Sequence, residues 1–226
     1  MVPIYEKTKT KVVTNMIVDL TIPLNEATLP FPDSNDPHMT WRHLVDHESY
    51  KAQVSLLSMV THLGTHVDAP LHFIPKGKTT AQVDLAKYCG SAVCLDMTRD
   101  ITGCTLVDIR PVLDRNKELI KPGDIIVLRT GWEEKVNTAD YYVFPDFDES
   151  VGEVLEQYGA NGIGFDLPSI DRAGAAHRAV LGRDMSIIES LINLKQLVGR
   201  RFFLSAAPLK FTDGDGSPVR AYAIVD

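Results

Sequence analysis

The clearest feature of the chain is a series of short apolar runs, each bounded by turn-forming residues. Runs of about four to eight apolar residues between such boundaries are typical of buried strands. The sequence therefore predicts strands within 16–24 and at 54–60, 92–97, 124–130, 161–166, 202–207 and 221–225. The strand at 124–130 follows a Pro-Gly turn, which supports its starting point.

Helix signals lie between the apolar runs. Over 149–159 apolar residues recur with the i, i+3, i+4, i+7 spacing of an amphipathic helix, and Gly159 stands where a C-terminal cap belongs. Thr105 can cap a second helix over 106–115, which Pro111 would kink.

A third helix is predicted over 186–194. Ser186 and Glu189 have the spacing of a capping box, in which the two side chains bond each other's backbone amides. Strands that alternate with helices indicate an α/β domain, with additional strands that need not be parallel. No repeat, low-complexity tract or linker divides the chain, so we expect a flexible N-terminal arm at 1–15 and a single domain over 16–226.

Composition and charge indicate a globular protein without nucleic-acid or membrane partners. The 226 residues are 44% hydrophobic and 23% charged, as in ordinary globular proteins. The net charge of −7 lacks the basic footprint of non-specific nucleic-acid binding, so no nucleic-acid partner is expected. No apolar run approaches the roughly 20 residues of a membrane span, and the N-terminus has no secretory signal, so no membrane partner is expected. Three cysteines without a paired spacing indicate free thiols and a cytoplasmic location.

The segment 61–73, THLGTHVDAPLHF, contains three of the chain's seven histidines. His62, His66 and Asp68 fall at even positions, so an extended chain would place them on one face. Two imidazoles and a carboxylate are suitable ligands for zinc or manganese. Both histidines can reach one ion only if the chain bends between them, and Gly64 is the residue that most easily permits a bend.

Two further histidines have open roles. His72 can be a metal ligand, a general base or a polar residue held under the loop. His177 is expected on the loop after the strand at 161–166, where active-site residues of α/β folds gather, although by itself it favours a structural role.

Two other patterns give weaker indications. His43 and His47 have the i, i+4 spacing of a metal pair on a helix, but strand-like sequence flanks them. The stretch 213–216, Asp-Gly-Asp-Gly, resembles the start of a calcium loop but lacks the acid that closes one, so no site is assigned there.

The segment 61–73 resembles the HxGTHxDxPxH signature of the bacterial cyclase-like metal hydrolases, a family that includes kynurenine formamidase and isatin hydrolase. Further segments resemble the family in the same order, at 122–132, 162–171 and 207–224. The resemblance implies a swivelling β/β/α-type fold, in which helices surround a mixed, barrel-like sheet. It also implies a homodimer.

The resemblance assigns roles to the candidate residues. It implies that His62, His66 and Asp68 bind metal and that His72 is the catalytic proton shuttle. His177 and Glu189 match the later ligands of a site for one or two divalent ions, zinc or manganese. For Glu189 this role competes with the capping box, because one carboxylate cannot fully satisfy both.

The expected function is metal-dependent hydrolysis of a C–N amide-type bond in a small aromatic or cyclic substrate. N-formylkynurenine is the first candidate, and isatin or another cyclic amide is the alternative. A polyketide-type cyclase and a non-catalytic metal-binding homologue are further alternatives. Formamidases carry a tryptophan that stacks on the substrate's ring. At that position this chain has Phe31, which we expect to line the substrate pocket with less stacking area and no indole N–H.

Overall fold

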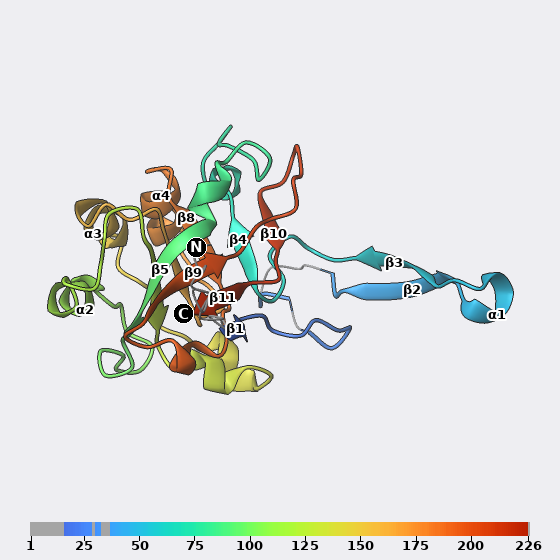
Figure 1. Ribbon diagram of the computed structural model, residues 1–226, viewed down its shortest axis with the longest axis horizontal. Coiled ribbons are helices and arrows are strands. Elements are labelled where there is room, and N and C mark those ends of the chain that lie inside the picture. The colour runs from blue at the N-terminus through green and yellow to red at the C-terminus, as the bar shows by residue number, and fades with distance from the viewer. Residues whose placement is uncertain (1–15, 29, 33–36, 226) are drawn as a thin grey trace, which may run out of the picture.

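The computed structural model describes residues 16–28, 30–32 and 37–225, and the arm predicted at 1–15 lies outside them. Nine strands form one mixed sheet in the order β1-β11-β9-β5-β6-β7-β8-β4-β10, which curls into a half-barrel (Figure 1). Its strands are β1 (Met16–Asp19), β4 (His66–Asp68), β5 (Cys89–Asp96), β6 (Ile125–Arg129), β7 (Gly162–Phe165), β8 (Ser186–Glu189), β9 (Arg201–Ser205), β10 (Gly216–Pro218) and β11 (Tyr222–Val225). The expected mixed, barrel-like sheet is confirmed.

The centre of the sheet is parallel and its two sides are antiparallel. β5, β6, β7 and β8 run parallel, as the alternating strands and helices of the sequence predict. Every residue of β6 is buried, which is typical of a parallel strand covered on both faces. Ile126 and Leu128 face one apolar cluster, whereas Ile125 and Val127 face another, because successive side chains point to opposite faces.

Three helices lie on the outer side of this sheet: α2 (Arg110–Arg115), α3 (Val151–Gln157) and α4 (Ala175–Leu181). They bury apolar side chains in the same cluster as Ile126 and Leu128. The predicted helix over 149–159 is confirmed as α3, and Gly159 follows it with a φ of +66°. Within the described residues, no helix is long and apolar enough to cross a membrane.

Two predicted helices differ from the observed elements. α2 begins at Arg110, so Thr105 does not cap it, and Pro111 lies in its first turn, where no backbone N–H is needed. The segment predicted as a helix from Ser186 is instead β8. Ser186 forms no capping box, and its hydroxyl donates to the backbone oxygen of Lys87, 2.5 Å away. Paired strands on both sides outweigh the local helix signal.

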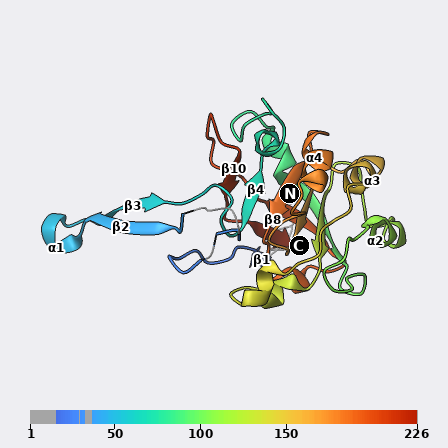
Figure 2. The same ribbon diagram turned by 180° about the vertical axis from the view of Figure 1, so that it is seen from behind.

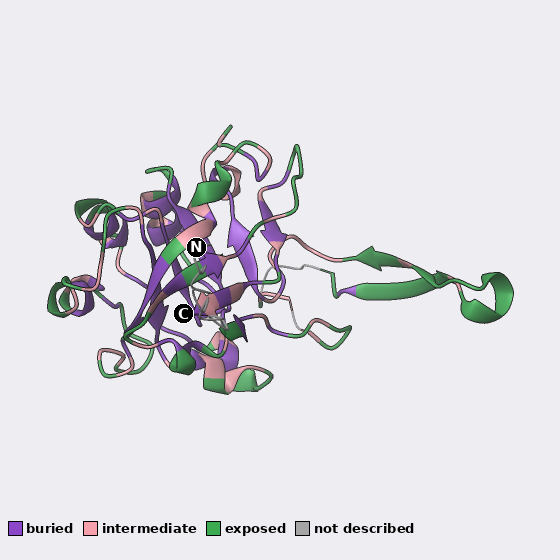
Figure 3. Cartoon of the chain, viewed as in Figure 1, coloured by how far each residue is buried: buried purple, intermediate pink, exposed green. Residues whose placement is uncertain are grey.

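A long hairpin projects from the body of the protein (Figures 1 and 2). It consists of β2 (Thr40–Val45), the short helix α1 (His47–Tyr50) at its tip and β3 (Val54–Ser58), and among the described residues these two strands pair only with each other. Figure 3 shows that most of the hairpin is exposed. A strand within 54–60 is therefore confirmed, but its predicted burial is wrong, because β3 has a partner on one side only and no layer over it.

Candidate metal centre

The two strands β4 and β8 place the first candidate ligands together. His66 and Asp68 lie two residues apart on β4, so their side chains share a face. Glu189 ends β8 directly opposite His66 in the antiparallel pair. All three are at least 97% buried. The even spacing read from the sequence therefore corresponds to one buried face of a strand.

His62 precedes β4 and reaches the same face because the chain bends between the two histidines. Gly64 has a φ of +63°, which favours glycine, and a Cβ there would lie 2.5 Å from Leu24 Cδ2. The bend brings His62 Nδ1 to 2.9 Å from Asp68 Oδ1. The predicted role of Gly64 is confirmed.

His177 reaches the cluster from the first half of α4, not from a loop. Its Nε2 lies 3.6 Å from Asp68 Oδ2 and 3.6 Å from Glu189 Oε1. His66 Nε2 lies 3.5 Å from Asp68 Oδ1 and 3.4 Å from Glu189 Oε2. The structure thus gathers five predicted ligands, three imidazoles around two carboxylates, from β4, β8, α4 and the bend before β4.

Each of the three imidazoles also has an acceptor on its outer side. His66 Nδ1 lies 2.8 Å from the backbone oxygen of Gly64, and His177 Nδ1 lies 2.6 Å from Asp171 Oδ1. His62 Nε2 lies 3.1 Å from Asp215 Oδ2. An acceptor on one ring nitrogen fixes the tautomer and leaves the other nitrogen to bind a metal, an arrangement typical of metal-ligating histidines.

One buried carboxylate oxygen of the cluster has no hydrogen-bond partner. Asp68 is fully buried, and its Oδ2 is one of two buried side-chain oxygens or nitrogens in the described part of the chain that have no hydrogen-bond partner. Burial opposes ionisation of Asp68, but the hydrogen bond with His62 and the nearby imidazoles outweigh it and lower its pKa. A buried, ionised oxygen without a partner is costly unless an ion binds it.

The nearby carboxylates raise the pKa of two of the imidazoles, His62 and His177. Burial disfavours their protonated forms, yet hydrogen bonds with Asp215 and Asp68 raise the pKa of His62 to about 10. In the same way the hydrogen bonds with Asp171 and Glu189 raise the pKa of His177 to about 9. A cation bound in the cluster would replace the protons that these rings otherwise carry.

His72 lies at the edge of the cluster, in the 3-10 turn Pro70–His72. Its ring stacks on that of His62, with centroids 3.8 Å apart, and its Nδ1 lies 3.8 Å from Asp215 Oδ2. The side chain is 27% exposed, compared with 20% for His62 and 4% or less for the other four ligand candidates. Both the ligand and the base interpretations of His72 fit this position.

Asp215 is the site residue that sequence reasoning missed. It belongs to the Asp-Gly-Asp-Gly stretch, to which no site was assigned, and it lies just before β10. Thr61 Oγ1 donates a hydrogen bond of 2.9 Å to Asp215 Oδ1. The only signal in the sequence was an acidic residue before a strand, because the histidines that it contacts lie about 150 residues away.

Two further sequence hypotheses are wrong. Glu189 is not in a capping box, since it ends a strand and its Oε1 accepts a 2.8 Å hydrogen bond from the backbone N–H of Ile170. His43 and His47 are not a pair on one helix. His43 lies on β2 and faces Ser55, whereas His47 begins α1 at the tip of the hairpin.

A cavity of about 530 Å³ opens beside His62 and His66. Its wall includes the predicted Phe31, which meets Tyr142 edge to face with ring centroids 6.1 Å apart. Tyr141 and Ser190 also line it. The cavity therefore offers aromatic surface for a ring and reaches the cluster at one end.

Comparisons with known proteins identify the family of the chain. The model of a family described as "Putative cyclase" matches residues 18–172. The chain is 33% identical to the kynurenine formamidase of Sphingopyxis alaskensis over 219 residues, which are 91% of this chain and 96% of that protein.

Solved structures share the fold. Isatin hydrolase A from Ralstonia solanacearum superposes with a TM-score of 0.82 at 23% identity, over 94% of this chain and 92% of that one. A protein named as a predicted metal-dependent hydrolase from Bacillus stearothermophilus superposes with a TM-score of 0.75 at 25% identity, over 93% and 98% of the two chains. The resemblance read from the sequence is confirmed, and the chain belongs to the cyclase family of hydrolases.

Proposed function

We propose that the protein is a metal-dependent hydrolase that cleaves the C–N bond of a small aryl amide, with an arylformamide such as N-formylkynurenine as the first candidate substrate. The relative from Sphingopyxis alaskensis bears the name kynurenine formamidase and matches nearly the full length of the chain. The observation that carries the proposal is the buried Asp68 Oδ2, which has no hydrogen-bond partner and lies among three imidazoles, two of which, His62 and His66, also line a cavity with aromatic walls.

The donor set fits one or two divalent ions, zinc or manganese. His62, His66, Asp68, His177 and Glu189 would hold them, with separations of 2.9 to 3.6 Å between neighbouring nitrogen and oxygen atoms. Ligand atoms at about 2.0–2.2 Å from one ion lie about this far apart. Two groups of potential ligands share Asp68: His62, Asp68 and His72 in one, and Asp68, His177 and Glu189 in the other. A shared carboxylate is compatible with two ions.

Residues of the chain would transfer the proton and bind the substrate. A bound divalent cation polarises a carbonyl and makes water ionise near neutral pH. His72 Nδ1 faces Asp215, which leaves Nε2 to take a proton from the attacking water and to return it to the departing nitrogen. Phe31 and Tyr142 line the cavity and would hold the ring of the substrate.

A second candidate substrate is isatin or another cyclic amide, opened to its acid. The likeness in fold to isatin hydrolase A favours it, with a TM-score of 0.82. Both candidates present a carbonyl next to an aryl nitrogen, so the same groups would act on either.

The test is elemental analysis of the purified protein followed by assays with zinc or manganese. We expect bound metal, release of formate from N-formylkynurenine or formanilide, and loss of activity with a chelator that added metal reverses. Ring opening of isatin without formamide cleavage would favour the second substrate. Metal-loaded protein that hydrolyses no formamide, ester or cyclic amide would contradict the proposal and favour a non-catalytic metal-binding protein.

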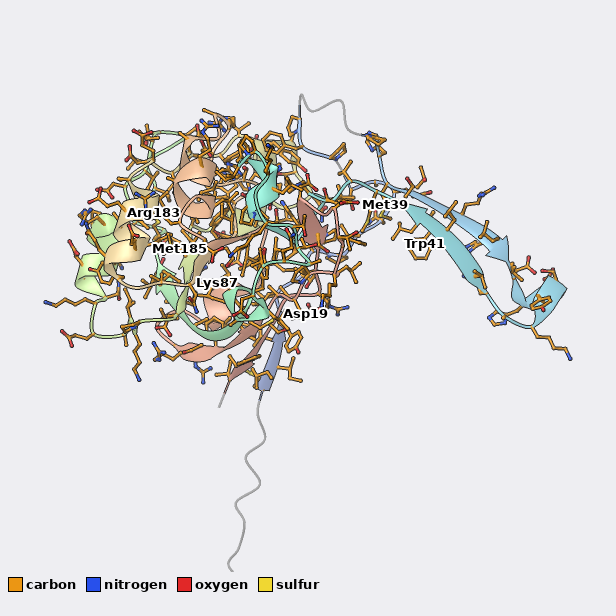
Figure 4. The ribbon with its side chains drawn as sticks, turned by 90° about the horizontal axis from the view of Figure 1, so that it is seen from above. Asp19, Met39, Trp41, Lys87, Arg183 and Met185 are labelled. Atoms are coloured by element: carbon orange, nitrogen blue, oxygen red, sulfur yellow. The ribbon has the colours of Figure 1, made fainter. Side chains whose placement is uncertain are left out.

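We further propose that the protein forms a homodimer, through the β2–β3 hairpin, and acts in the cytoplasm. An isolated two-stranded hairpin is marginal in water. The hairpin exposes Trp41, Leu44 and Leu56 by about half or more of each residue's surface, and Figure 4 shows Trp41 outside the body of the protein. Exposed apolar patches mark interaction sites. Light scattering on the full chain should give twice the monomer mass, and Trp41→Glu should shift it towards the monomer.

A further inference from the structure

Phe73 directly follows His72 and places an aromatic ring against two imidazoles of the site. Its ring stacks on that of His177, with centroids 4.2 Å apart and planes at 26°. It meets the His72 ring edge to face, with centroids 4.5 Å apart and planes at 80°. The described residues that line the cavity beside His62 and His66 do not include Phe73. The ring therefore contacts the site without forming part of the cavity wall.

The ring of Phe73 is itself held in place. Its backbone N–H donates to the backbone oxygen of Pro70, and its side chain packs against the apolar cluster that the three helices cover. Gly174 leaves the space for the ring, because a Cβ there would lie 2.3 Å from Phe73 Cε1. The guanidinium carbon of Arg178 lies 6.0 Å from the ring centroid, at the limit of a cation–π contact. The ring cannot move away from the imidazoles without loss of this packing.

The stacked contact restrains His177 in a way that its hydrogen bond does not. The 2.6 Å contact with Asp171 fixes one ring nitrogen, but the ring can still swing about the line that joins Nδ1 to the carboxylate oxygen. Phe73 lies against one face of the imidazole and blocks that swing in one direction. His177 Nε2 is thereby held towards the cluster, 3.6 Å from an oxygen of Asp68 and from one of Glu189.

For His72, ring contacts take the place of a hydrogen bond. Its Nδ1 lies 3.8 Å from Asp215 Oδ2, which is beyond hydrogen-bond distance. His62 stacks on the His72 ring, and Phe73 contacts it edge to face. The centroids of the His72 and His177 rings lie 5.7 Å apart, and Phe73 touches both. One side chain therefore sets the relative position of the proposed base and a proposed metal ligand.

We propose that Phe73 is a positioning residue of the metal centre, whose ring fixes the planes of the His177 and His72 imidazoles. It aligns His177 with the ion and His72 with the attacking water. Both effects act through the imidazoles, since Phe73 has no atom that binds metal or carries a proton. The effect on His177 rests on the metal centre alone, and the effect on His72 rests on the proposed function.

The test compares Phe73→Leu, which keeps apolar bulk but removes the ring, with Phe73→Tyr, which keeps the ring. Zinc affinity is measured by competition with a chromogenic chelator, and the absorption spectrum of cobalt-loaded protein reports the geometry at the ion. We expect Phe73→Leu to weaken zinc binding by about three- to tenfold, as for one lost aromatic contact, and to change the cobalt spectrum. Phe73→Tyr should stay close to wild type in both. Equal losses in the two variants overturn the inference, because the ring is then not the feature that matters.

Kinetics of zinc-saturated protein with formanilide test the effect on His72. Phe73→Leu should lower kcat by about 10- to 100-fold, because a misplaced base transfers the proton less effectively. KM should stay close to the wild-type value, because the ring is outside the cavity wall. An increase in KM with unchanged kcat would make Phe73 a substrate-binding residue and overturn this part of the inference.

The matched control is Phe202→Leu, the same substitution at a buried position of β9, which β5, β6 and β7 separate from β8. It should lower the unfolding temperature but keep the zinc affinity, the cobalt spectrum and kcat. Thermal unfolding of the metal-free protein shows that each variant is folded. Wild-type zinc affinity and cobalt spectrum in Phe73→Leu overturn the inference. Equal losses in Phe73→Leu and Phe202→Leu also overturn it, because both would then reflect lost stability alone.

The metal measurements separate failure of this inference from failure of the proposed function. If the wild type binds zinc but cleaves no formamide, ester or cyclic amide, the proposed function fails, and zinc affinity and the cobalt spectrum still decide whether Phe73 positions His177. If formanilide is cleaved and Phe73→Leu keeps wild-type zinc affinity, spectrum and kcat, the proposed function stands and this inference is overturned. A wild type that binds no zinc overturns both.

Discussion

Asp215 Oδ2 lies 3.1 Å from His62 Nε2, although 153 residues separate the two in the sequence. The contact leaves His62 Nδ1 facing Asp68, towards the centre of the cluster. Asp171 holds His177 in the corresponding way. These outer carboxylates orient the rings before any ion binds, and they therefore strengthen the affinity of the site for metal.

Asp215→Asn should weaken metal binding by about 10- to 100-fold, because the outer acceptor that orients His62 loses its charge. The affinity is measured by competition with a chromogenic chelator. Asp213→Asn is the matched control, since Asp213 lies two residues away and is exposed. Equal affinities for the two variants would show that Asp215 does not support the site.

His72→Ala should lower kcat by about 10²- to 10⁴-fold, the range typical of a lost general base. Metal content should stay close to that of the wild type, because the five ligand candidates, four of them buried, remain. Steady-state kinetics with formanilide and elemental analysis of the same preparation measure both quantities. Loss of one equivalent of metal would instead make His72 a ligand, as its place in a group with His62 and Asp68 allows.

Metal affinity should increase with pH. In the metal-free protein the pKa of His62 is about 10 and that of His177 about 9, so both rings carry protons at neutral pH. A metal must displace these protons, and raising the pH removes that competition. Between about pH 6 and 8 the apparent affinity should rise about tenfold per pH unit for each proton displaced. Titrations in buffers of different ionisation enthalpy count the released protons, and a pH-independent affinity would contradict the raised pKa values.

Arg201→Met should destabilise the fold by about 2–4 kcal/mol, because it leaves a buried carboxylate without its charge partner. Arg201 bonds both oxygens of Asp124, at 2.6 and 2.7 Å, and Asp124 is 1% exposed. Urea unfolding measures the change. Arg220→Met is the control, since Arg220 forms a comparable pair with Asp19 in an exposed position and should cost less than about 1 kcal/mol.

This difference between wild type and Arg201→Met should depend on pH in a defined direction. Burial raises the pKa of Asp124, but the hydrogen bonds with Arg201 outweigh burial and lower it below 3.8 in the folded protein. Its contribution to stability is therefore present above pH 3.8 and is lost as the pH falls through the lowered pKa. A cost of Arg201→Met that grows on acidification would contradict this assignment.

Two segments differ from their sequence predictions for a common reason. The Ser186–Glu189 spacing is a genuine capping-box pattern, yet pairing with β7 and β4 makes the segment a strand. The apolar run at 54–60 has the composition of a buried strand, yet it forms one side of an exposed hairpin. Propensity describes what a segment favours by itself, whereas neighbours in the fold decide what it becomes.

The sequence by itself determined the α/β class, the cluster at His62, His66 and Asp68 and the need for a glycine between the histidines, because these depend on residues close together in the chain. Only the tertiary structure decided that Asp215 and Asp171 orient the imidazoles, that Glu189 joins the cluster from a strand, and that Tyr141 and Ser190 lie in the cavity wall. The physical reason is the separation of the residues along the sequence. Ligands within one segment are recognisable from their spacing. Hydrogen-bond acceptors of the imidazoles and the walls of the cavity come from distant segments, which strand pairing and loop closure bring together.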